Sequence, residues 1–160
     1  MTCTSDRLLD NVKWRLETLT THTDKDGTLK DFVYYDKDKL TGELTSGMTR
    51  GFSLDWEGSR PNSDEASVMD MAVQQYDHSL VVRVAYHKNE NWLTLQRLIL
   101  RDRFDIVKLL RDPDTWVGYD GDTSLDLSIG ARQMIRDEIV ETAQAAYLVQ
   151  HWLINMIEVE

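Results

Sequence analysis

The chain has 160 residues, of which 41% are hydrophobic and 29% charged, and its formal charge at pH 7 is −10 with a pI near 4.8. This length suits one domain with one hydrophobic core, and the apolar content is well above that of disordered segments. The acidity argues against a protein that holds nucleic acid by neutralising phosphates, because that mode needs clustered Lys and Arg. We therefore expect a single folded domain over residues 1–160 that has no sequence-specific contact with nucleic acid.

The compartment is indicated by what the chain lacks. Cys3 is the single cysteine, so the chain has no internal disulfide and none of the cysteine spacings of zinc sites. Residues 1–10 show no basic region followed by an apolar one, and no apolar run reaches the roughly 18 residues that span a bilayer. We expect a protein of the reducing cytoplasm without membrane contact.

The N-terminal third begins with a predicted helix. Ser5 to Leu19 places apolar residues three and four positions apart, which predicts a helix with one core face. A polar stretch follows, and Phe32 to Tyr35 is a short predicted strand. Asp36 to Arg50 contains three turn-like sites and few apolar residues, so we predict a long loop or loose hairpin there. The predicted core face of the helix comprises Leu8, Leu9, Val12, Leu16 and Leu19.

The middle of the chain carries the β signals. Apolar and polar residues alternate over 52–57, which predicts a half-buried strand, and Gly58 to Glu65 is a predicted polar turn. Residues 69–73 and Leu80 to Tyr86 are then predicted to pair as an antiparallel hairpin, with its turn at Tyr76 to Ser79.

A second helix is predicted from Leu93 to Arg111, with Asn91 as its N-cap and Pro113 beyond its end. Asp102 interrupts the apolar stripe of this helix. We expect Asp102 to pair with Arg101, Arg103 or a backbone group, since a lone buried carboxylate is costly.

The C-terminal part adds further strands. Trp116 to Tyr119 is a possible short strand before a turn at residues 120–122. Arg132 to Thr142 fits a helix or a strand, and we favour the strand because Tyr147 to Val159 is apolar on both alternating faces and so must be a strand covered on both sides. The sequence predicts an α+β fold, with a mixed, mostly antiparallel sheet flanked by two main helices and a long polar loop or hairpin at about 36–65.

The doubly apolar C-terminal strand bears on function. Two helices cover one sheet face, so the second face is expected to be a protein interface, most simply within a symmetric oligomer. The alternative is that Asp36 to Arg50 closes over that face within the monomer. The candidate interface residues lie on the presumed strands, and tryptophan is favoured in interface hot spots; they are Phe52, Leu54, Trp56, Trp152, Ile154 and Met156.

The sequence offers little support for catalysis or metal binding. Residues 22–27 faintly match a calcium loop, but His22 stands at the first ligand position and Val33 at the twelfth. The four histidines have no zinc-site spacing, and the chain has no nucleophile elbow or phosphate-binding glycine pattern. We predict no catalytic residue, no cofactor and no metal site. Two further carboxylate clusters sit at predicted turns, where Asp supports turn geometry: Asp36, Asp38 and Glu43, and Asp112, Asp114, Asp120 and Asp122.

From about Ser79 onward the order of elements resembles the tail-terminator proteins of long-tailed bacteriophages. The likeness is carried by the strand Leu80 to Tyr86, the helical segment Asp105 to Leu110 with the loop to Trp116, and two late strands, Arg132 to Glu141 and Leu148 to Val159. The N-terminal helix also fits. The stretch Asp36 to Glu65 is longer and more polar than the resemblance leads one to expect.

The resemblance implies a non-enzymatic virion protein of the tail or neck. It implies a hexameric ring that ends tail-tube growth and joins the tail to the head, with the tail-tube protein and a head-completion or connector protein as partners. The acidity would suit passage of DNA through the lumen.

Two other functions stay open. A small acidic binding module of the immunity or inhibitor type would stay monomeric until it meets a basic target. An enzyme would need an active site assembled from distant carboxylates and histidines.

Overall fold

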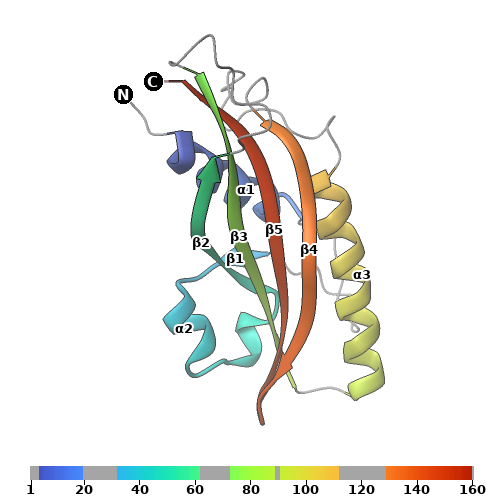
Figure 1. Cartoon of the computed structure of the whole chain (residues 1–160). Helices are drawn as coiled ribbons and strands as arrows, with labels where there is room; N and C mark the ends of the chain where they lie inside the picture. The colour runs from blue at the N-terminus through green and yellow to red at the C-terminus, as the bar shows by residue number, and fades with distance from the viewer. Residues whose placement is uncertain (1–3, 20–31, 62–72, 89–90, 112–128, 160) are drawn as a thin grey trace.

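The computed structural model describes residues 4–19, 32–61, 73–88, 91–111 and 129–159 (Figure 1). The fold is α+β, as predicted, and has a five-stranded mixed sheet with helices on both faces. In chain order the elements are α1 (Thr4–Glu17), β1 (Val33–Tyr34), α2 (Lys37–Thr41), the 3-10 turn η1 (Ser46–Met48), β2 (Gly51–Pro61), β3 (Val73–His87), α3 (Trp92–Arg111), β4 (Ile129–Glu141) and β5 (Ala145–Val159).

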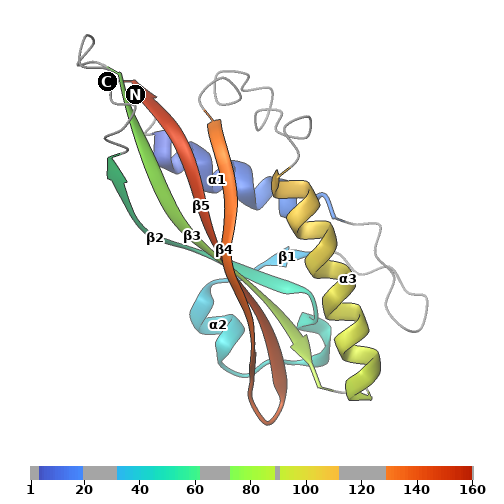
Figure 2. The ribbon, with the colours of Figure 1, turned by 45° about the vertical axis from the view of Figure 1, so that its right-hand side comes forward.

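The sheet has the strand order β1-β2-β3-β5-β4. Only β1 and β2 run parallel, and the other pairs are antiparallel. The long strands β3 and β5 pair from Val73↔Val159 to His87↔Ala145, which makes them the centre of the sheet. The edges are β4 on one side and the two-residue β1 beside β2 on the other. Helices α1 and α3 lie over one face, and α2 and η1 lie over part of the other (Figures 1 and 2).

The main core lies between the sheet and the two long helices. Both helices form as the apolar spacing predicts, and Asn91 caps α3, since its Oδ1 accepts from the N–H groups of Leu93 at 2.9 Å and Thr94 at 3.4 Å. The buried side chains of this core are Leu8, Val12 and Leu16 of α1, Leu95, Ile99, Ile106 and Leu110 of α3, and Phe32, Phe52, Leu80, Val82, Val84, Tyr86, Ala146, Leu148, Trp152, Ile154 and Met156.

A second, smaller core lies on the opposite sheet face, where the prediction of a loop over 36–50 is wrong. Leu40 of α2, together with Leu44 and Met48, packs onto β3 and β5, and the hydroxyl of Tyr147 donates to the Leu40 carbonyl at 3.1 Å. Three apolar residues suffice to fold this segment against the sheet because β5 offers an apolar face there. For this part of the sheet, residues 36–50 therefore cover the face within the monomer, which was the alternative to an interface. The strand residues of this core are Val81, Ala85, Ala145, Tyr147 and Val149.

The predicted hairpin with a turn at Tyr76 to Ser79 is also wrong. These residues continue through β3, with Tyr76 paired to Met156 and Ser79 to Leu153. Strand pairing on both sides overrides the local turn preference of Asp77-His78-Ser79. Residues 69–72 of the expected hairpin lie outside the described residues.

Strand β2 runs further than expected, to Pro61 instead of ending at Glu57 before a turn. Gly58 has φ +123°, a conformation that glycine tolerates, and it forms a bulge after Trp56 in the pairing with β3. Gly58 therefore lies at a bulge within the strand and not in the predicted turn. The strand predictions for residues 132–142 and 147–159 are confirmed by β4 and β5. The segments 22–27, 62–65, 116–119 and 120–122 lie outside the described residues.

Candidate interaction surfaces

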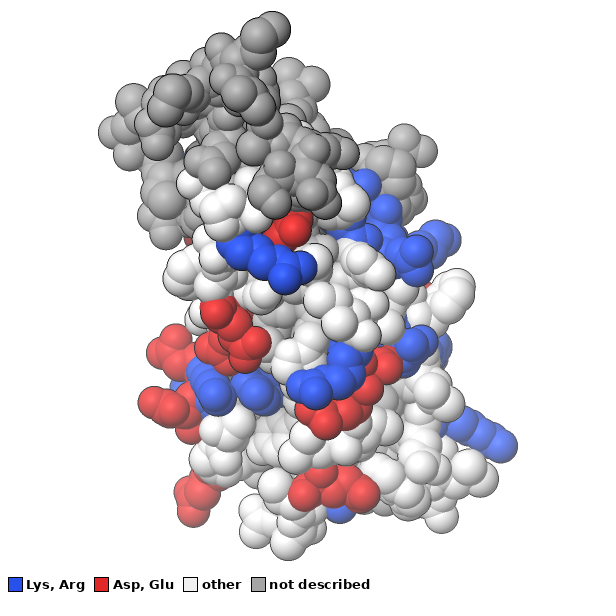
Figure 3. All heavy atoms as spheres, viewed as in Figure 1, with Lys and Arg blue, Asp and Glu red and all other residues white. Residues whose placement is uncertain are grey.

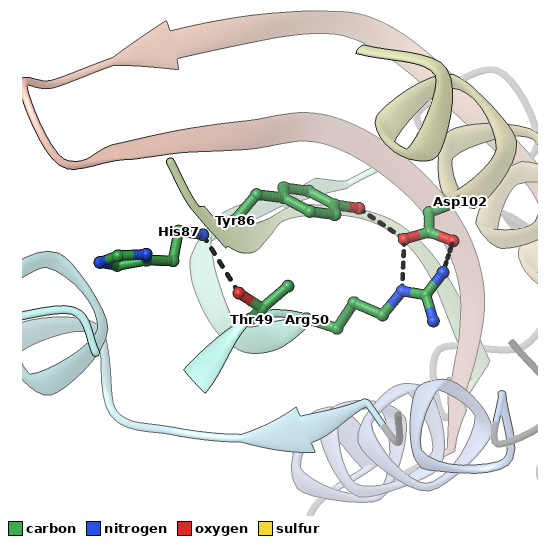
Figure 4. Close-up of polar contacts among 5 residues, drawn as sticks. All are labelled: Thr49, Arg50, Tyr86, His87 and Asp102. Carbon is green, nitrogen blue, oxygen red and sulfur yellow. Dashed lines mark hydrogen bonds and ion pairs between the residues drawn. The ribbon is translucent and has the colours of Figure 1, made fainter. Parts of the chain in front are cut away.

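A buried ion pair ties α3 to the sheet (Figure 4). The Asp102 carboxylate accepts from Arg50 Nε at 2.9 Å and from Arg50 Nη2 at 3.0 Å, and the Tyr86 hydroxyl donates to it at 3.0 Å. Both charged side chains are fully buried. The expectation that Asp102 is paired is right, but its identified partners come from the loop before β2 and from β3. Neighbouring Arg103 instead pairs with Asp137 of β4.

Arg50 is held in place by its backbone as well as by its side chain. Its φ of 66° lies in the left-handed region, which costs a residue other than glycine about 1–2 kcal/mol. The Arg50 N–H donates to the Ala85 carbonyl at 2.7 Å, and the Thr49 hydroxyl accepts from the His87 N–H at 3.2 Å. The guanidinium lies 5.8 Å from the Phe32 ring centroid. These contacts offset the backbone strain and fix the loop that carries the cation.

The Tyr86 hydroxyl of this network stays protonated at ordinary pH. Burial, with the nearby Asp102 carboxylate, raises the pKa of the Tyr86 phenol well above its usual value of 10.0. The hydroxyl therefore remains a donor to Asp102 throughout the physiological range. The bonds to Asp102 therefore hold α3 in one position against the sheet, with the opposite side of the helix facing outward.

The outer face of α3 is partly apolar. Phe104 is 64% exposed and Leu100 60%, and Leu93 is also largely exposed. The spacing of seven and four residues places these side chains along one side of the helix. Next to them on the sheet edge, Ile139 of β4 is exposed and pairs with Leu148 of the main core, so it lies on the α3 side of the sheet. We therefore consider these side chains a candidate interaction surface.

The exposed charges of α3 are all positive. Its acids are Asp102, which is buried against Arg50, and Asp105, which is half-buried. Lys and Arg accordingly predominate on the right-hand edge in Figure 3, in a chain whose net charge is −10. We call this surface the α3 strip, and it comprises Leu93, Arg97, Leu100, Arg101, Phe104, Lys108 and Arg111.

The α3 strip contains an open hollow near its C-terminal end. The hollow has a volume of ≈360 Å³, and Phe104, Val107, Lys108 and Arg111 line it among the described residues. An apolar floor flanked by two cations suits an aromatic ring with a negative charge beside it.

The opposite edge of the sheet also exposes apolar side chains. These are Val33 of β1 and Trp56 of β2, and Trp56 is 48% exposed. The Trp56 indole N–H donates to His78 Nδ1 at 3.1 Å, and His78 itself is buried. The exposed indole is therefore held in one orientation. Its neighbour Glu57 is exposed.

The six residues predicted as an interface differ in how much of each side chain is exposed. Phe52, Trp152, Ile154 and Met156 are buried in the main core under α1 and α3, and Leu54 is half-buried against it. They leave almost no surface to a partner, because both helices pack on that sheet face. Trp56 is the one of the six that is exposed. Leu100, Phe104 and the cations of α3 went unnoticed in the sequence, although apolar residues on the far side of the predicted helix stripe could have revealed them.

The uncovered part of the second sheet face carries both apolar and charged side chains, and Val140 of β4, which pairs with Tyr147, is exposed there. A hollow of ≈340 Å³ lies between α2 and β4. Its lining joins the apolar side chains Val81, Val140, Tyr147 and Val149 to the polar side chains Glu57, Arg83, Arg136, Glu138 and His151. These charges largely compensate one another: Arg83 bonds Asp55 at 3.3 Å, and Glu138 lies 4.0 Å from Arg136 and 3.9 Å from His151. We see no ligand class that this mixed set would select.

The comparisons with known proteins leave the family open. No protein-family model matches the chain, and no curated protein matches it. Among the described residues, no three His, Cys, Asp or Glu side chains gather as a metal site would require. No helix in the described part of the chain is long and apolar enough to cross a membrane.

Proposed function

We propose that the protein is a structural subunit of the phage tail-terminator kind, which assembles into a hexameric ring in the tail or neck of the virion. In this role it ends tail-tube growth and joins the tail to the head, and its partners are further copies of itself, the tail-tube protein and the head-completion or connector protein. It carries out no reaction.

One observation carries the proposal: exposed apolar side chains stand at opposite edges of the sheet. The α3 strip adjoins β4, and Trp56 with Val33 belongs to the β1–β2 edge. A two-fold dimer needs a single self-complementary surface, whereas a ring needs two different surfaces on each subunit. Two separate surfaces are therefore what ring assembly would use.

The packing of the subunit suits such a role. The buried Arg50–Asp102 pair and the Arg103–Asp137 pair hold α3 against the sheet, so that both edges belong to one rigid unit. A rigid subunit pays little conformational entropy on assembly. The specific assignment to tails comes from the resemblance in the sequence described above, which is carried by residues 80–86, 105–116, 132–141 and 148–159.

Light scattering after gel filtration, with electron microscopy of the purified protein, tests the proposal. We expect rings of six copies at micromolar concentration, either alone or on added tail tubes. The variant Phe104→Glu should reduce the particle to a monomer, because it places a charge in the centre of the α3 strip. Gln144→Glu adds the same charge in the exposed β4–β5 turn and should leave the rings intact.

A wild-type protein that stays monomeric at high concentration and does not cap tail tubes would overturn the proposal. It would favour the inhibitor alternative, which a stable complex with a basic partner would then support.

A further inference from the structure

We draw no further inference here: the strongest candidate, the open hollow at the C-terminal end of the α3 strip between Phe104, Val107, Lys108 and Arg111, is a partly apolar helix face for which nothing in the described part of the structure shows what covers it.

Discussion

At the scale of single residues, Asp102 shows how a buried charge is held among the described residues. Its carboxylate has no exposure and receives two bonds from Arg50 and one from Tyr86. The sequence marks Asp102 as unusual because it interrupts an apolar helical stripe. It does not reveal the partner, because Arg50 lies 52 residues away in a segment with few apolar residues.

Asp102→Asn should destabilise the fold by about 3–5 kcal/mol, because it leaves the buried Arg50 cation without its counter-charge. Equilibrium unfolding in urea measures the loss. Combining it with Arg50→Met should recover part of the stability, since the unpaired charge is then removed. If the single and double variants lose the same free energy of unfolding, the unpaired Arg50 charge is not the reason for the loss.

Tyr86→Phe should make stability less sensitive to alkaline pH. The pKa of the Tyr86 phenol is raised in the folded chain, so its contribution is fully present below the unfolded pKa of about 10 and is lost as pH rises through the folded value. Above pH 10 the wild type should therefore lose stability more steeply than the variant. At neutral pH the variant should be less stable by about 1.5–3 kcal/mol, the value of a hydrogen bond to a charged group.

Unfolding at a series of pH values from 7 to 11 measures both effects. Tyr35→Phe, which removes a hydroxyl from a half-buried tyrosine outside the network, is the control. Parallel pH profiles for the wild type and Tyr86→Phe would contradict the assignment.

At the scale of elements, α2 shows how a polar segment can become part of the core. Lys37–Thr41 has a single buried residue, Leu40, and local preference alone would not make five residues helical. The apolar face of β3 and β5 stabilises it from outside. The same strands account for the false turn at Tyr76 to Ser79, because pairing on two sides outweighs local propensity.

Leu40→Ala should lower the free energy of unfolding by about 2–5 kcal/mol, the usual cost of removing a buried leucine side chain. Lys37→Ala on the exposed side of the same helix is the matched control and should change stability by less than about 0.5 kcal/mol. Urea titration compares the two. If Leu40→Ala behaves like the control, α2 is not a structural cover of the sheet.

At the scale of the whole molecule, the distribution of charge is more informative than its sum. The net charge of −10 indicates only that the surface is acidic overall. The arrangement in space gathers exposed Lys and Arg with Leu100 and Phe104 at α3, while Trp56 is exposed at the β1–β2 edge. The proposed ring is argued from the exposed apolar side chains at these two separate edges.

The sequence by itself determined the fold class, the two long helices, the N-cap at Asn91 and the strands at 132–142 and 147–159, because these depend on periodicities and caps within short segments. The tertiary structure alone decided the partner of Asp102, the folding of α2 over the second face and the burial of Phe52, Trp152, Ile154 and Met156. Each of these depends on contacts between residues far apart in the chain. It also decided that the α3 strip and Trp56 stand at opposite edges, since strand order depends on long-range pairing.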